Sequence, residues 1–183
     1  MTEEFDVNAW MVRVNSRGVS GLFTDKTPDD KQSSEYLQLS CWMDGMRESF
    51  EVDVAEHRAV AKDPPDFEVR IDDHWSSVEL TEFVNGPFLK KVAMHRRIRI
   101  NYNAYHGEGF VDAQWNKAKF LEHLNELIDK KAERLINQSI SVDILVVATA
   151  EPWLYRTNVQ EWLSGEYPKS KIDPFNKVYI VMG

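Results

Sequence analysis

Cysteine is nearly absent from the 183-residue sequence, which contains only Cys41. A single thiol cannot form an intrachain disulfide, a CxxC redox pair or a cysteine-based zinc cluster. We therefore expect a reducing, cytoplasmic setting. The chain also has no run of about 18 consecutive apolar residues, and no basic region leads into an apolar stretch at its N-terminus. These two absences predict that it has neither a membrane span nor a signal peptide.

Several common functional motifs are missing as well. The sequence contains no P-loop and no Gly-x-Ser-x-Gly element, and Gly107-Glu108-Gly109 lacks the third glycine of a dinucleotide-binding turn. Its five histidines show none of the HxH or HExxH spacings that hold zinc. These gaps argue against dinucleotide binding and against a histidine-based metal centre.

Positive charge is scarce overall, because 22 Lys and Arg stand against 30 Asp and Glu and give a net charge of −8. A chain of this sign does not coat nucleic acid through its overall field, since duplex binding relies on Lys and Arg to neutralise phosphates. The basic residues are nevertheless clustered. Residues 83–107 contain no Asp or Glu and carry Lys90, Lys91, Arg96, Arg97 and Arg99. This stretch is either a local nucleic-acid contact or a solvated basic segment.

The apolar pattern predicts one α/β domain over residues 1–183, with a mixed central β-sheet flanked by helices. Strands are expected at 9–14, 50–54, 67–71, 75–81, 142–147 and 178–181. The last two are almost entirely apolar, so we expect interior strands covered on both faces. The crossover between them, with a short helix near 159–163, should make them parallel neighbours.

Two longer helices are expected. The first begins near Ser33 or Ser34, which could cap it, and Gly45 should end it. The second is the clearest element of the sequence and runs from about Ala113 to Asn137. Asp112 is a good N-cap residue for it. Its apolar residues form one stripe, and its acidic and basic residues lie on the opposite face of the helix. This helix must pack on a sheet or on another helix.

The strands at 67–71 and 75–81 should form a hairpin around Asp72-Asp73, the turn-like dipeptide between them. With a two-residue loop, Asp66 lies opposite Glu79, with Cβ atoms roughly 4.5–5.5 Å apart. A four-residue loop would shift the partners but keep the same residues on each face. One face is apolar, and the other carries Asp66, Glu68, Ser77, Glu79 and Thr81.

Opposed carboxylates repel each other, and a hard divalent cation between them would remove that repulsion. Mg²⁺ or Mn²⁺ is the expected ion, because Mg²⁺ binds one or two carboxylates and completes its shell with water and substrate phosphate. An acidic, solvated hairpin face is the alternative that the spacing alone leaves open.

The order of the expected elements resembles the α-β-β-β-α-β core of the PD-(D/E)XK nuclease-like superfamily, the restriction-endonuclease-like fold. The resemblance is strongest in Pro65-Asp66-Phe67 and in Val78-Glu79-Leu80-Thr81-Glu82, which are similar to the Pro-Asp-Phe and Glu-x-Thr variant of its motif. It covers residues 33–148, and 149–183 would be a helix–strand extension.

This resemblance implies a divalent-metal-dependent nuclease that hydrolyses phosphodiester bonds of nucleic acid, with DNA as the expected substrate and RNA as the alternative. It implies that Asp66, Glu79 and the backbone carbonyl of Leu80 bind Mg²⁺ or Mn²⁺. Thr81 stands where the family usually has a lysine, which is thought to orient the attacking water and stabilise developing charge.

The missing lysine has two candidate substitutes on the long helix, Lys130 and Lys131. Glu35 is the best match for the acidic residue that the first helix of the family often adds. Because Thr81 replaces the lysine, a catalytically inactive relative that binds nucleic acid or a protein partner is the alternative function. A third reading is an accessory protein whose acidic surface docks a basic partner. The sequence predicts no membrane partner and leaves a homo-oligomer open.

Overall fold

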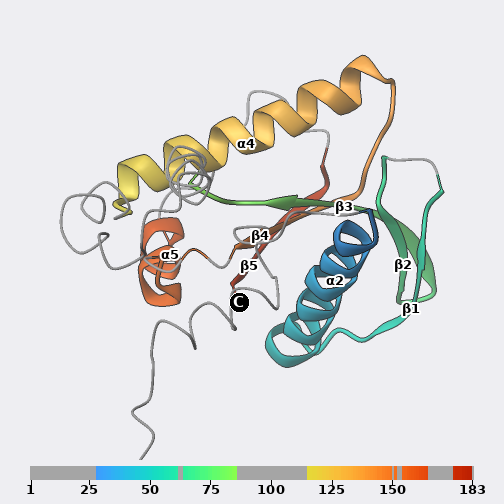
Figure 1. The fold of residues 1–183 in the computed structure, drawn as a ribbon. Helices are drawn as coiled ribbons and strands as arrows, with labels where there is room; N and C mark the ends of the chain where they lie inside the picture. Colours follow the sequence, from blue (N-terminus) through green and yellow to red (C-terminus); the bar gives the residue numbers. More distant parts are fainter. Residues whose placement is uncertain are drawn as a thin grey trace, which may run out of the picture.

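The computed structural model describes residues 28–61, 64–85, 115–149, 151, 154–164 and 175–182. In this part the chain is an α/β fold with a five-stranded mixed sheet and three helices (Figure 1). None of these helices is long and apolar enough to cross a membrane. The strand expected at 9–14 and the five basic side chains expected to contact nucleic acid fall outside the described residues.

The sheet combines an antiparallel half with a parallel half. Its strands are β1 (Val54–Ala59), β2 (Phe67–Ile71), β3 (His74–Glu82), β4 (Ile144–Thr149) and β5 (Lys177–Met182), and they lie side by side in that order. The pairs β1–β2 and β2–β3 are antiparallel, whereas β3–β4 and β4–β5 are parallel. Parallel neighbours need long crossovers, which contain the helices that follow β3 and β4.

Helices cover both faces of this sheet. Helix α2 (Pro28–Phe50) lies on one face, and α4 (Lys117–Asn137) crosses the other (Figure 1). Under α2, buried Leu39, Trp42 and Met46 pack on strand residues that include Phe67, Val69, Val78 and Leu80. Helix α4 and the short α5 (Arg156–Leu163) share the second apolar core, which contains Leu124, Ile128, Leu135, Leu145, Val147 and Val159. The sheet is therefore the middle layer between two cores.

The β2–β3 hairpin has the predicted two-residue loop. Phe67 pairs with Val78 and Ile71 with His74, which leaves Asp72 and Asp73 as the turn. Both turn residues have positive φ, 48° and 65°. Two consecutive left-handed residues suit the right-handed twist of the flanking strands, and Asp tolerates that conformation better than most residues. The predicted pairing register is confirmed.

Helix α2 extends beyond the predicted end at Gly45, so this boundary prediction is wrong. The helix continues to Phe50, and β1, the strand expected at 50–54, begins only at Val54. An interior glycine costs about 1 kcal/mol relative to alanine. Trp42 and Met46, buried on either side of Gly45, anchor the helix to the sheet, and this packing outweighs the local cost.

Helix α4 ends at the predicted Asn137 but begins at Lys117, later than expected. Its N-cap is Asn116, whose side-chain oxygen accepts the backbone N–H of Lys119 at 2.9 Å, and not Asp112. The predicted apolar stripe is confirmed at Leu124, Ile128 and Leu135, which are buried, whereas Ile136 is largely exposed.

The two C-terminal strands are parallel neighbours, as predicted, but they differ in burial. All six residues of β4 are buried. Strand β5 lies at the end of the described sheet and its residues are half-buried or exposed, so its prediction as an interior strand is wrong. A continuous apolar run does not distinguish an interior strand from an apolar edge strand, because that difference depends on neighbours far away in the sequence.

Candidate metal centre

Asp66 and Glu79 meet at the open end of the β2–β3 hairpin. Asp66 immediately precedes β2, and Glu79 lies on β3 one residue beyond the last ladder pair, Phe67 with Val78. Glu79 is only 1% exposed and Asp66 is half-buried. The negative charge of the Glu79 carboxylate raises the pKa of Asp66, which shows that the two charges interact. The structure thus brings the predicted acidic pair together.

Backbone groups of Leu80 complete this end of the hairpin. The β2 ladder ends at Phe67, so β3 continues beyond its partner strand here. The Leu80 N–H donates to Asp66 Oδ2 at 2.7 Å, and the Leu80 carbonyl accepts from Lys131 Nζ at 3.1 Å. Side chains therefore provide the pairing that the neighbouring strand would otherwise supply.

Lys131 is the lysine that reaches the acidic pair. Its Nζ lies 2.5 Å from Glu79 Oε1, and its side chain is only 21% exposed. Lys130, the other candidate on α4, points elsewhere: its side chain is 75% exposed, and its nearest anionic partner is Glu126 at 3.5 Å, on the same helix. Of the two candidates, the structure thus brings Lys131 and not Lys130 to the carboxylates.

Arg134 is a neighbouring cation that the sequence reasoning missed. Its Nη1 lies 4.0 Å from Glu79 Oε1, and the side chain is 41% exposed. Arg134 follows Lys131 by three positions, and residues at that spacing share one face of a helix. This spacing could have predicted the contact, because a side chain three positions after Lys131 lies on the same helix face and reaches the same part of the sheet.

Burial and charge strongly perturb Asp66. Desolvation contributes most to raising its pKa, to about 6, and the Glu79 charge adds to the effect. The Leu80 N–H and the Lys131 ammonium act in the opposite direction. Glu35, from α2, is also close enough for its charge to raise the pKa of Asp66. Glu35 therefore lies near the acidic pair.

Thr81 is half-buried on β3, two residues after Glu79. Alternate residues of a strand share a face, so Thr81 lies on the α4 side together with Glu79. A lysine at this position would enter the site from the sheet. In this chain Lys131 reaches Glu79 from the facing helix, and its ammonium is held by Glu79 and by the Leu80 carbonyl.

The oxygen atoms at this site suit a hard divalent cation. Two carboxylates and a carbonyl are the ligand types that Mg²⁺ or Mn²⁺ takes from proteins. Glu79 Oε2 is buried and has no hydrogen-bond partner within the described part of the chain. Among the described residues there is no group of three or more His, Cys, Asp or Glu placed to hold a metal. The protein share of a metal shell here would therefore be two carboxylates and the Leu80 carbonyl.

A second buried carboxylate, Glu151, lies beyond the end of β4 and is fully paired. Its Oε1 accepts the Asn85 backbone N–H at 2.6 Å, and its Oε2 accepts the Trp115 indole N–H at 3.3 Å. Burial, the largest cause, raises its pKa, and both donors oppose that shift. Glu151 thus joins three separate chain segments and leaves no oxygen open.

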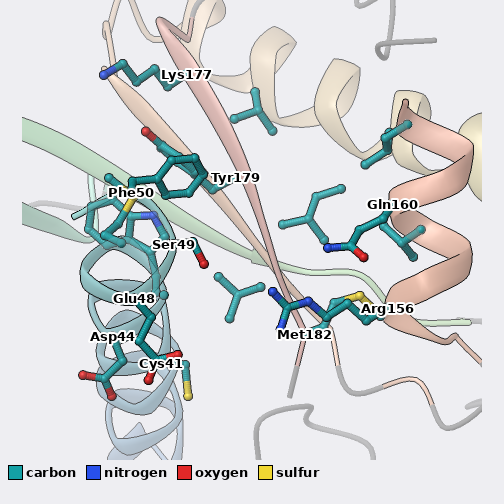
Figure 2. A pocket seen from close by; sticks show the side chains of 18 of the residues that line it. Cys41, Asp44, Glu48, Ser49, Phe50, Arg156, Gln160, Lys177, Tyr179 and Met182 are labelled. Atoms are coloured by element: carbon teal, nitrogen blue, oxygen red, sulfur yellow. The ribbon is translucent and has the colours of Figure 1, made fainter. Parts of the chain in front are cut away.

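A cavity along β5 is a separate feature. It measures about 920 Å³ and runs along β5 between α2 and α5. Figure 2 shows Asp44 and Glu48 on the α2 wall, Arg156 and Gln160 on the α5 wall, and Tyr179 of β5 between them. Asp66, Glu79 and Lys131 are not among the residues that line it. The acidic pair is therefore not part of this cavity.

Comparisons of the chain with protein-family models, with curated proteins and with solved structures find no significant match.

Proposed function

We propose that this chain is a divalent-metal-dependent nuclease with a restriction-endonuclease-like core, which hydrolyses phosphodiester bonds of nucleic acid, in the first place DNA. The order α2-β1-β2-β3-α4-β4 supports the proposed core, because it matches the expected α-β-β-β-α-β succession. Helix α5 and strand β5 would then be the C-terminal extension.

The observation that carries the proposal is the convergence of Asp66, Glu79 and Lys131 at one end of the hairpin. A carboxylate buried to 1% exposure costs several kcal/mol unless it is paired. Glu79 has a cationic partner at one oxygen only, and Asp66 is held partly protonated near neutral pH by the same surroundings. Such an arrangement is typical of a functional site and is expensive as a purely structural one.

Each side chain would have a defined part in the reaction. Asp66, Glu79 and the Leu80 carbonyl would hold Mg²⁺ or Mn²⁺. When bound, the ion would polarise the phosphate and lower the pKa of a bound water. Lys131 would supply positive charge beside the reacting phosphate, in place of the lysine that Thr81 replaces. The basic residues of 83–107 would neutralise neighbouring phosphates.

A cleavage assay tests this function. The purified protein should cut single- or double-stranded DNA in Mg²⁺ or Mn²⁺ and not in EDTA, and Asp66→Asn and Glu79→Gln should abolish cleavage. Glu68→Gln is the matched control, because Glu68 lies on the same hairpin but pairs with Arg58 at the surface. Cleavage that survives in both site variants would reject the assignment, and cleavage of RNA alone would change the substrate class.

A catalytically inactive relative that binds nucleic acid or a protein partner is the second candidate. The Lys131–Glu79 contact favours it, because an ammonium already compensates the buried carboxylate without a metal. Binding of DNA without any cleavage, together with no response to Mn²⁺, would support this alternative.

A further inference from the structure

The ammonium of Lys131 and the proposed metal ion require the same oxygen atoms. Lys131 Nζ lies 2.5 Å from Glu79 Oε1 and 3.1 Å from the Leu80 carbonyl oxygen. These are two of the three protein groups that would bind the metal. An ammonium that donates to these oxygens occupies the space of a divalent ion, whose ligand distances are about 2.0–2.1 Å for Mg²⁺.

We propose that Lys131 is an internal competitor for the metal, so that the site exchanges an ammonium for a divalent cation. This inference rests on the proposed metal site at Asp66 and Glu79. Two cations cannot bind the same oxygens side by side without strong repulsion. Metal entry therefore requires the Lys131 ammonium to leave Glu79 Oε1 and the Leu80 carbonyl.

The surroundings of Lys131 permit this exchange. Its side chain is 21% exposed, and a lysine has a flexible four-carbon stem that can carry the ammonium toward water. Glu79 Oε2 is buried and has no partner within the described residues, so this carboxylate oxygen is available to a metal once the ammonium has left. The structure thus supplies an exit for the ammonium and a carboxylate oxygen that the ammonium does not occupy.

The competition also gives Lys131 a different role from a permanent metal neighbour. While the site is metal-free, the ammonium compensates the buried Glu79 charge and keeps the hairpin end paired. Once the metal has replaced it, the ammonium is released at the rim of the same site, where it can face a substrate phosphate. Lys131 is therefore a gate on metal affinity in addition to its proposed contact with substrate.

Calorimetric titration with Mn²⁺ tests the competition without measuring cleavage. Lys131→Met removes the competing cation, and we expect it to bind Mn²⁺ roughly 10- to 100-fold more tightly than the wild type. Lys130→Met is the matched control. It removes the same charge from the adjacent, solvent-exposed position and should bind Mn²⁺ like the wild type. Lys131→Gln serves if the Met variant does not fold.

The possible results separate the competition from the proposed function. Equal or weaker Mn²⁺ binding by Lys131→Met, with binding intact in the wild type, would overturn the competition and leave the metal site standing. Binding by the variant and not by the wild type would support the competition and overturn the metal-dependent function of the native chain. No Mn²⁺ binding by any variant would overturn both.

Discussion

Glu79 and Glu151 are both buried carboxylates, yet their partners differ in kind. Glu151 is 6% exposed, and two neutral N–H groups from Asn85 and Trp115 occupy its two oxygens. Glu79 is 1% exposed, and it has a lysine ammonium at one oxygen and no described partner at the other.

This difference in partners indicates a different role for each carboxylate. Neutral donors fixed in the backbone and in an indole ring cannot be exchanged, so Glu151 serves to join chain segments. An ammonium on a flexible stem can move aside, so the compensation of the Glu79 charge is exchangeable. A buried carboxylate with exchangeable compensation is a candidate functional group, whereas one with fixed compensation is a structural group.

The largest expected effect is on Lys131. Lys131→Met should lower the free energy of unfolding of the metal-free protein by about 3 to 5 kcal/mol, because it removes the ammonium from the buried Glu79 carboxylate and leaves the 41%-exposed Arg134, at 4.0 Å, as the cation beside it. Lys130→Met should change it by less than about 0.5 kcal/mol. Urea denaturation measures both, and Mn²⁺ should restore much of the loss in the Lys131 variant alone. Equal stabilities of the two variants would remove the contrast with Glu151.

The pH dependence of stability tests whether the surroundings of Asp66 destabilise its ionised form. Its folded-state pKa of about 6 exceeds the ordinary value of 3.8, so the folded protein holds a proton that the unfolded chain releases between these values. Stability is therefore highest below pH 3.8 with respect to this group, falls as pH rises to about 6, and stays lower above it.

Asp66→Asn removes this penalty and keeps an oxygen that can accept the Leu80 N–H. At pH 7 the variant should be more stable than the wild type by at most about 3 kcal/mol, and near pH 4 the two should be equal. Denaturation at both pH values provides the measurement. A stability difference between variant and wild type that does not change with pH would mean that the surroundings do not destabilise ionised Asp66.

Glu151→Gln should produce a smaller loss, about 1 to 3 kcal/mol, because the new amide NH₂ faces a donor and leaves one N–H unsatisfied. The Mn²⁺-induced rise in melting temperature should stay as in the wild type, and Mn²⁺ should not restore the lost stability. A changed metal response in this variant would show that the two carboxylates belong to one connected site.

The smallest effect is expected at Gly45. No atom lies within 4 Å of a Cβ placed there, so alanine fits the interior of α2. Gly45→Ala should raise the free energy of unfolding by about 0.5 to 1 kcal/mol. Thermal denaturation measures the gain. Combining Gly45→Ala with Lys131→Met would give the double variant extra stability for metal titrations. If Gly45→Ala instead lowered the stability, the helix surface at this position would already be packed.

Much of the local structure could be predicted from the sequence. The alternation of 67–71 and 75–81 with Asp72-Asp73 between them specifies a hairpin, its register and its two faces. Side-chain alternation has a period of two, so a one-residue error would have exposed Phe67 and Val69. The same register placed Asp66 next to Glu79, which is why the acidic pair could be predicted.

The edges of elements depended on contacts that the sequence does not display. Helix α2 continues through Gly45 because Trp42 and Met46 pack on the sheet, and β5 lies at the end of the described sheet, where its residues are half-buried or exposed. Both facts concern segments that are distant in the sequence. Neither helix propensity nor apolar content contains that information.

By itself, the sequence determined the acidic hairpin, the long amphipathic helix and the order of the elements. Only the tertiary structure decided that Lys131 and not Lys130 reaches Glu79. Adjacent residues of a helix point about 100° apart, so the two lysines face different surroundings once the helix is docked. The rotation of α4 about its axis is set by the burial of Leu124, Ile128 and Leu135 against the sheet, and that packing directs Lys131 to the carboxylates.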